Sequence, residues 1–148
     1  EKVFADEVAV LIGFYKNAEH LQWILKNNLY NFRTGTDRGS LPLSDMHLHA
    51  KYLILHGKDE LETDKIFKLT AKGPRIFSRN DLLKKGYPEP RGELYVVFQL
   101  ERDASDDFEK IKIDLRRLTQ FETYRNSAKP FSATLSEVLK SKIMRDAQ

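Results

Sequence analysis

Runs of apolar, β-branched and aromatic residues alternate with polar stretches along the chain and predict short strands. A continuous apolar run indicates a buried strand over 8–15, and largely apolar runs indicate further buried strands over 50–56, 66–69 and 93–100. Alternation of apolar and polar residues indicates half-buried strands over 29–33 and 108–115. For the first run, a helix beginning near Phe4 is the alternative, and we favour the strand because the run is short and rich in β-branched residues.

Capping residues and helical spacing predict three helices. These helices cover 18–27 after the N-cap Asn17, 79–85 after the N-cap Ser78, and 134–144. Ser78 and Thr134 are each followed at the third position by an acidic residue, which is typical of a capping box. Gly86 is a suitable C-cap for the second helix, and Pro88 and Pro90 prevent its continuation.

The order of these elements predicts an α+β fold built on a small, mostly antiparallel β-barrel. Most connections are too short for the crossover helices that a parallel sheet needs. The length of 148 residues suits one domain over 1–148, with a barrel core over about 8–115 and a C-terminal helical extension over about 116–148.

Composition narrows the class of protein further. The chain is 41% hydrophobic and 32% charged, and no apolar run approaches the roughly 20 residues that a membrane span needs. The absence of cysteine excludes disulfides, thiolate metal sites and cysteine nucleophiles. We therefore expect a cytoplasmic protein without membrane contact, and, because the first residue is Glu1, a part of a longer protein or assembly.

Charge is unevenly spread along the chain. The net charge is only +3, but the segment 68–91 holds seven basic and two acidic residues, a local charge of +5. Acidic residues flank it on both sides. The segment is either a solvated loop and helix face or a surface that contacts phosphates.

The region from Val8 to Leu100 resembles the PUA-like superfamily, in particular its ASCH and EVE branches. It has an apolar strand, a helix, a strand ending in Arg33 and a strand-rich stretch closed by 95–98. Of the ASCH pattern Gly-x-Lys-x-x-Glu-x-Arg, Gly13 and Lys16 lie one residue further apart, and Asn31 replaces the acid two residues before Arg33. The resemblance implies a small barrel that binds RNA or modified nucleobases, as similar modules of modification-dependent restriction systems do.

The loop after Arg33 combines arginines, hydroxyl groups and glycines, which can present donors to a phosphate or a base edge. The leading hypothesis is therefore a module that binds DNA or RNA, with a modified or flipped base as the possible target. Its predicted contacts are Asn31, Arg33, Thr34, Thr36, Arg38 and Ser40 for reading the ligand, and Lys72, Arg75, Arg79, Lys84 and Lys85 for phosphates.

Two other functions stay open. One is hydrolysis of a modified nucleoside, with Lys16, Glu19 and Thr34 as candidates, and the other is protein docking through the helix over 134–144. We expect binding rather than catalysis, without a cofactor or metal, because no complete catalytic set is present. Of the histidines His47, His49 and His56, His49 with Lys51 matches the start of the His-x-Lys-x4-Asp pattern of phospholipase D-type nucleases. His56 stands where the aspartate of that pattern belongs, and no second motif is present.

Overall fold

The computed structural model describes residues 8–15, 17–33, 50–57, 60–70, 74–87, 94–108, 112–119, 121 and 131–142. Their elements are β1 (Ala9–Phe14), α1 (Ala18–Asn27), β2 (Leu29–Arg33), β3 (Tyr52–His56), β4 (Glu62–Thr63), β5 (Ile66–Leu69), β6 (Arg75–Ser78), α3 (Arg79–Lys84), β7 (Leu94–Asp103), β8 (Ile113–Asp114), β9 (Phe131–Thr134) and α5 (Leu135–Lys140). Short 3-10 helices occupy η2 (Ser105–Phe108) and η3 (Leu115–Arg117).

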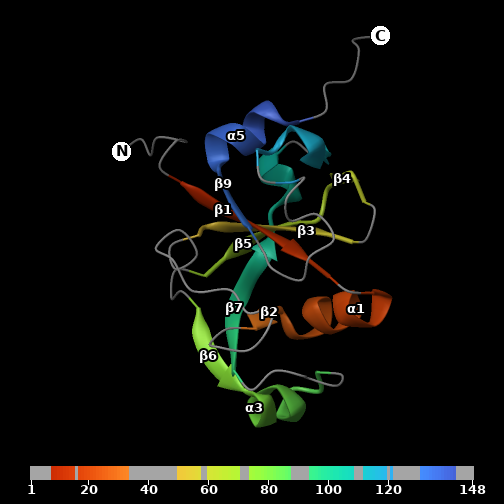
Figure 1. The fold of residues 1–148 in the computed structure, drawn as a ribbon, viewed down its shortest axis with the longest axis vertical. Coiled ribbons are helices and arrows are strands. Elements are labelled where there is room, and N and C mark those ends of the chain that lie inside the picture. Colours follow the sequence, from red (N-terminus) through yellow and green to blue (C-terminus); the bar gives the residue numbers. More distant parts are fainter. Residues whose placement is uncertain are drawn as a thin grey trace.

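The main sheet has the strand order β2-β7-β5-β3-β1-β9, and β6 also pairs with β7 (Figure 1). All of these pairs are antiparallel except β1 with β3. The predicted α+β class and mostly antiparallel sheet are therefore confirmed, and the sheet curls into a half-barrel.

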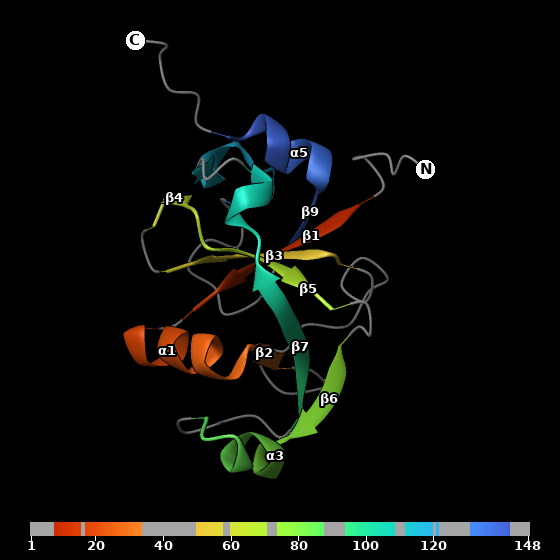
Figure 2. The ribbon, with the colours of Figure 1, turned by 180° about the vertical axis from the view of Figure 1, so that it is seen from behind.

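Strand β7 runs from the end of the molecule that holds α3 to its middle, where β3 and β5 lie (Figures 1 and 2). Its first half pairs with β2 and β6, near α1 and α3, and its second half pairs with β5. The register shifts between Lys68 and Leu69, whose partners Arg102 and Leu100 leave one extra residue on β7. Such a bulge bends the strand, which lets β7 belong to both parts of the curled sheet.

Strand β1 is buried on both faces. Val10 and Ile12 belong to the hydrophobic cluster that includes Val138 of α5, whereas Leu11 belongs to the cluster that includes Trp23 of α1. A strand covered on both sides needs apolar side chains at every position. The uninterrupted apolar run that predicted this strand is therefore the consequence of two cores, one on each side of the sheet.

Gly13 lets the ring of Tyr30 lie directly against β1. A Cβ atom at Gly13 would lie 2.6 Å from both the Cζ atom and the hydroxyl oxygen of Tyr30. That hydroxyl accepts a hydrogen bond from the Phe14 amide at 3.2 Å, and burial raises the pKa of the phenol well above its usual range. The small residue is thus required where two strands meet through one buried aromatic ring.

Three predictions about local structure need correction. Within the described part of the predicted strand over 108–115, Phe108 belongs to η2, β8 covers Ile113–Asp114 and Leu115 begins η3. The predicted helix over 134–144 is α5, which ends at Lys140. Strands β4, β6 and β9 were not predicted, because they are short and lack the largely apolar sequence that indicated β5. Strand β9 pairs with β1, so part of the predicted C-terminal extension belongs to the main sheet.

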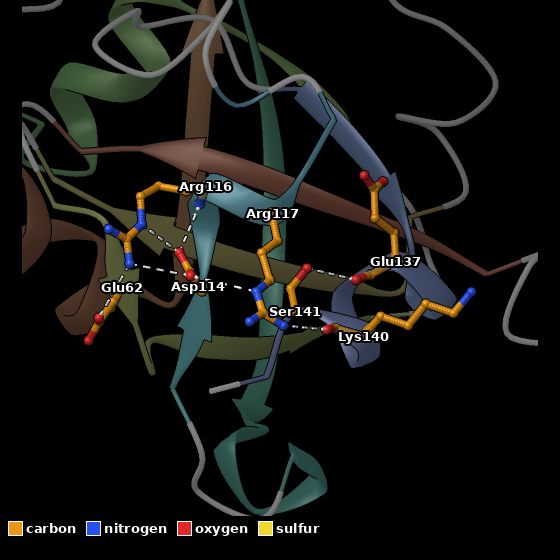
Figure 3. A network of polar contacts seen from close by, with 7 residues as sticks. All are labelled: Glu62, Asp114, Arg116, Arg117, Glu137, Lys140 and Ser141. Carbon is orange, nitrogen blue, oxygen red and sulfur yellow. Dashed lines mark hydrogen bonds and ion pairs between the residues drawn. The ribbon is translucent and has the colours of Figure 1, made fainter. Parts of the chain in front are cut away.

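A network of charged groups joins β4, β8, η3 and α5 (Figure 3). Asp114 accepts a hydrogen bond from Arg116 Nε at 2.9 Å and lies 3.8 Å from Arg117 Nε. Arg116 also approaches Glu62 at 3.9 Å, and Arg117 donates to the carbonyl of Lys140. Hydrogen bonding to Arg116 lowers the pKa of the Asp114 carboxyl.

Asp114→Asn is expected to remove a pH-dependent part of the stability. Because the folded pKa of Asp114 lies below its unfolded value, its contribution is fully present above about pH 4 and is lost as the pH falls through the folded pKa. Since Arg116 is half exposed, we expect the variant to lower Tm by only about 2–4 °C at pH 7. Thermal unfolding should show that difference disappearing near pH 2, and an equal difference at both pH values would contradict the assignment.

Candidate functional site

A depression of about 230 Å³ opens on the sheet where β2, β7 and β6 lie side by side. Leu29, Val97 and Phe77 form its apolar floor. These residues share one face because Leu29 pairs with Gln99, and Val97 and Phe77 lie on that same face of the pleated sheet. The site is therefore built on paired strands.

Polar side chains line the depression together with these apolar residues. They are Asn27 at the end of α1, Arg75 on β6, Lys85 after α3 and Gln99 on β7. Among the described residues, neither Arg75 nor Lys85 forms an ion pair, and both are exposed. Two cations and two amides thus line one shallow depression beside its apolar residues, and the charges of the two cations are available to a ligand.

Helix α3 reverses the direction of the chain between Arg75, at the start of β6, and Lys85, directly after the helix. It begins with a reciprocal capping box between Ser78 and Asp81, as predicted. It ends with the amides of Gly86 and Tyr87 donating to the carbonyls of Leu83 and Leu82, both at 3.0 Å. This is a Schellman motif, and the φ of +80° at Gly86 is the left-handed conformation that it needs.

Helix α1 packs beside the site, on the same face of the sheet, through an aromatic cluster. Trp23 and His20 both form T-shaped contacts with Tyr87, with ring centroids 4.8 Å and 5.6 Å apart, and Tyr87 in turn contacts Tyr95. Buried beside them, His20 Nε2 lies 3.3 Å from Asn31 Oδ1. A buried polar pair needs such a partner, so this contact stabilises the packing of α1 on β2.

The structure brings together two of the predicted phosphate contacts, Arg75 and Lys85, at the depression. Arg79 and Lys84 are exposed on α3 and do not line it. Asn31 is 4% exposed and contacts His20, while Arg33 ends β2 with its side chain outside the described part. The predicted contacts Thr34, Thr36, Arg38, Ser40 and Lys72 lie outside the described residues.

The residues of the alternative functions are placed as follows. Lys16, Thr34, His47 and His49 lie outside the described residues, and Glu19 is exposed in the first turn of α1. His56 is 2% exposed, with its ring centroid 5.6 Å from those of both Phe14 and Phe121. Helix α5 packs on the sheet through Val138, and Leu139 is its one exposed large apolar side chain in the described range.

Sequence reasoning missed the floor of the depression and its two amides. Leu29, Phe77 and Val97 have the residue types of a core, and nothing local distinguishes them from buried side chains. Asn27 and Gln99 lie 72 positions apart in the sequence and meet only through the pairing of β2 with β7. The position of Gln99 after an apolar run was the available signal, since it interrupts a strand otherwise buried from 95 to 100.

Two further properties concern the described residues. None of their His, Asp and Glu side chains gather in groups of three or more that could hold a metal ion. None of their helices is long and apolar enough to cross a membrane.

Comparisons with known proteins give one structural similarity. No family model and no curated protein matches the chain. Among solved structures, it is similar to the YTH domain of the Zygosaccharomyces rouxii MRB1 protein, which was crystallised in complex with N6-methyladenosine RNA. The two share 17% sequence identity with a TM-score of 0.47, over 97% of this chain and 90% of that one. At this level the similarity carries no argument, and the function has to be inferred from the site itself.

Proposed function

We propose that this domain binds nucleic acid at the depression between β2, β6 and β7. The observation that supports this most is the pair of cations, Arg75 and Lys85, that line the depression together with apolar residues and have no ion-pair partners among the described residues. Cations in this arrangement favour a ligand with repeated negative charge, and phosphates along a nucleic-acid backbone provide it.

The floor supports a ligand with an accessible base. Leu29 and Phe77, both half-buried, offer an apolar surface on which a base can lie, and stacking on an aromatic ring contributes about 1–3 kcal/mol. In a duplex the faces of the bases are hidden by their neighbours. The bound segment is therefore single-stranded, or carries a base turned out of the helix.

The size of the depression favours a polymer over a free metabolite. Clefts that enclose small molecules have volumes of roughly 300–1,000 Å³, and this one has about 230 Å³ and is open to solvent. It accommodates one base of a longer chain whose neighbouring phosphates lie outside it. Lys84 and Arg79, on the exposed side of α3, would extend the phosphate contacts beyond the rim.

The amides give the site a means of choosing a base. A side-chain amide presents a donor and an acceptor together, as Asn27 and Gln99 do here. We propose that they read the edge of the bound base, with a modified base as the target class. The PUA-like assignment, the role in a larger assembly such as a restriction system, and the cytoplasmic location stay proposals; the helix between the first two strands of a curled sheet supports the first of them.

Titration of the protein with single-stranded and duplex oligonucleotides at several salt concentrations tests this function. The single strand should bind more tightly, and the logarithm of its affinity should fall with the logarithm of the salt concentration by about 0.7 per phosphate contacted. Duplexes with and without modified bases serve as comparison ligands. Absence of binding, or binding that does not respond to salt, would contradict the proposal.

A further inference from the structure

We propose that Trp23 is a positioning residue that keeps Lys85 at the rim of the depression; this role rests on the proposed function. The indole Nε1–H of Trp23 donates a hydrogen bond of 2.9 Å to the main-chain carbonyl of Lys85. The two residues are 62 positions apart, so the bond joins α1 to the end of α3. It acts on the backbone and leaves the charged side chain of Lys85 available.

The bond satisfies a group that helix geometry leaves without a partner. Lys85 is the C-cap of α3, and the last carbonyls of a helix accept no hydrogen bond from the amides of that helix. Trp23 is 6% exposed, so its N–H lies away from solvent and would be costly to leave without an acceptor. The indole N–H therefore gains an acceptor and the Lys85 carbonyl gains a donor, which makes the contact specific rather than incidental.

Contacts of Tyr87 also fix the turn that follows α3. The ring of Tyr87 lies against Trp23 with the centroids 4.8 Å apart, and the Tyr87 amide donates to Leu82. The backbone at Lys85 is thus fixed both by the hydrogen bond to α1 and by the Schellman motif at the end of α3. A cation on a backbone fixed before binding loses less conformational freedom when a phosphate arrives. Without the Trp23 bond, the turn can move and that advantage is lost.

Substitutions that remove the indole N–H donor test this role in binding. Trp23→Phe should weaken the affinity for a single-stranded oligonucleotide about threefold to tenfold. It should have no effect in a Lys85→Ala background and its full effect in a Lys84→Ala background, because Lys84 does not line the site. Ile24→Val, a packing loss in the same helix, is the control and should leave affinity unchanged. Where Trp23→Phe fails to fold, benzothienylalanine at position 23 removes the N–H and keeps the shape.

Hydrogen exchange in the free protein provides a readout that needs no ligand. The amides of Gly86 and Tyr87 should exchange about tenfold faster in the Trp23 variant than in Ile24→Val. Binding that depends on Lys85 but not on Trp23, or unchanged exchange at this turn, would overturn the positioning role alone. Absence of oligonucleotide binding by the unaltered protein would overturn the proposed function, and with it this role.

Discussion

Replacing both Arg75 and Lys85 by alanine is expected to lower the affinity for a single-stranded oligonucleotide by roughly 10- to 20-fold at physiological salt. Each side chain would contact one phosphate, and each contact releases about 0.7 of a condensed counterion from a single strand. The salt dependence should therefore become shallower by about 1.4 in the double variant, and by half of that in each single variant. Fluorescence anisotropy titrations at several salt concentrations measure both quantities.

The control for this loss is a cation on another part of the surface. Lys112 precedes β8, is exposed and does not line the depression. Lys112→Ala changes the net charge by the same amount as either single variant and should alter affinity and salt dependence only slightly. An equal loss for Lys112→Ala would mean that binding follows overall charge, and the proposed site would be wrong.

Gly13→Ala is expected to reduce the free energy of unfolding by about 2–3 kcal/mol. The new methyl group would lie 2.6 Å from the ring and the hydroxyl oxygen of Tyr30. The ring has no space to retreat because it is fully buried and its hydroxyl bonds to Phe14. Either β1 moves away from β2 or the ring leaves its hydrogen bonds, and both cost packing. Chemical denaturation monitored by circular dichroism measures the change.

Gly86→Ala separates a steric clash from backbone strain. No heavy atom lies within 4 Å of a Cβ atom at Gly86, so its cost comes only from the φ of +80° and should be about 1 kcal/mol. Tyr30→Ala provides the second test, because the methyl group at position 13 should cost far less once the ring is absent. Additive effects of Gly13→Ala and Tyr30→Ala would show that the two positions do not clash.

The fold was predictable where the sequence pattern depends on local geometry. The cap at Asn17, the capping box at Ser78 and the turn at Gly86 were found because their residue types satisfy backbone groups within a few positions. The buried strand β1 was found because both of its faces are covered. At Thr134 the capping-box pattern predicted one of the two contacts of such a box. The Thr134 hydroxyl caps α5, but the Glu137 carboxylate accepts a hydrogen bond from the Thr119 amide at 2.6 Å.

The site was less accessible from sequence because it is a product of strand pairing. Charge density identified Arg75 and Lys85, but their joint position depends on α3 reversing the chain. Asn31 has the residue type of a ligand contact, yet its strand register directs it toward His20 of α1. The parallel pairing of β1 with β3 likewise follows from contacts that no short window contains.

The central claim is that nucleic acid binds on the face formed by β2, β6 and β7, and mapping of backbone amide chemical shifts tests it most directly. On titration with a single-stranded oligonucleotide, we expect the largest shift changes at Leu29, Phe77, Lys85, Val97 and Gln99. Amides of α5 and β9, at the opposite end of the molecule in Figure 1, should remain unchanged. Shift changes concentrated on α5 and β9, with none around the depression, would contradict the proposed site.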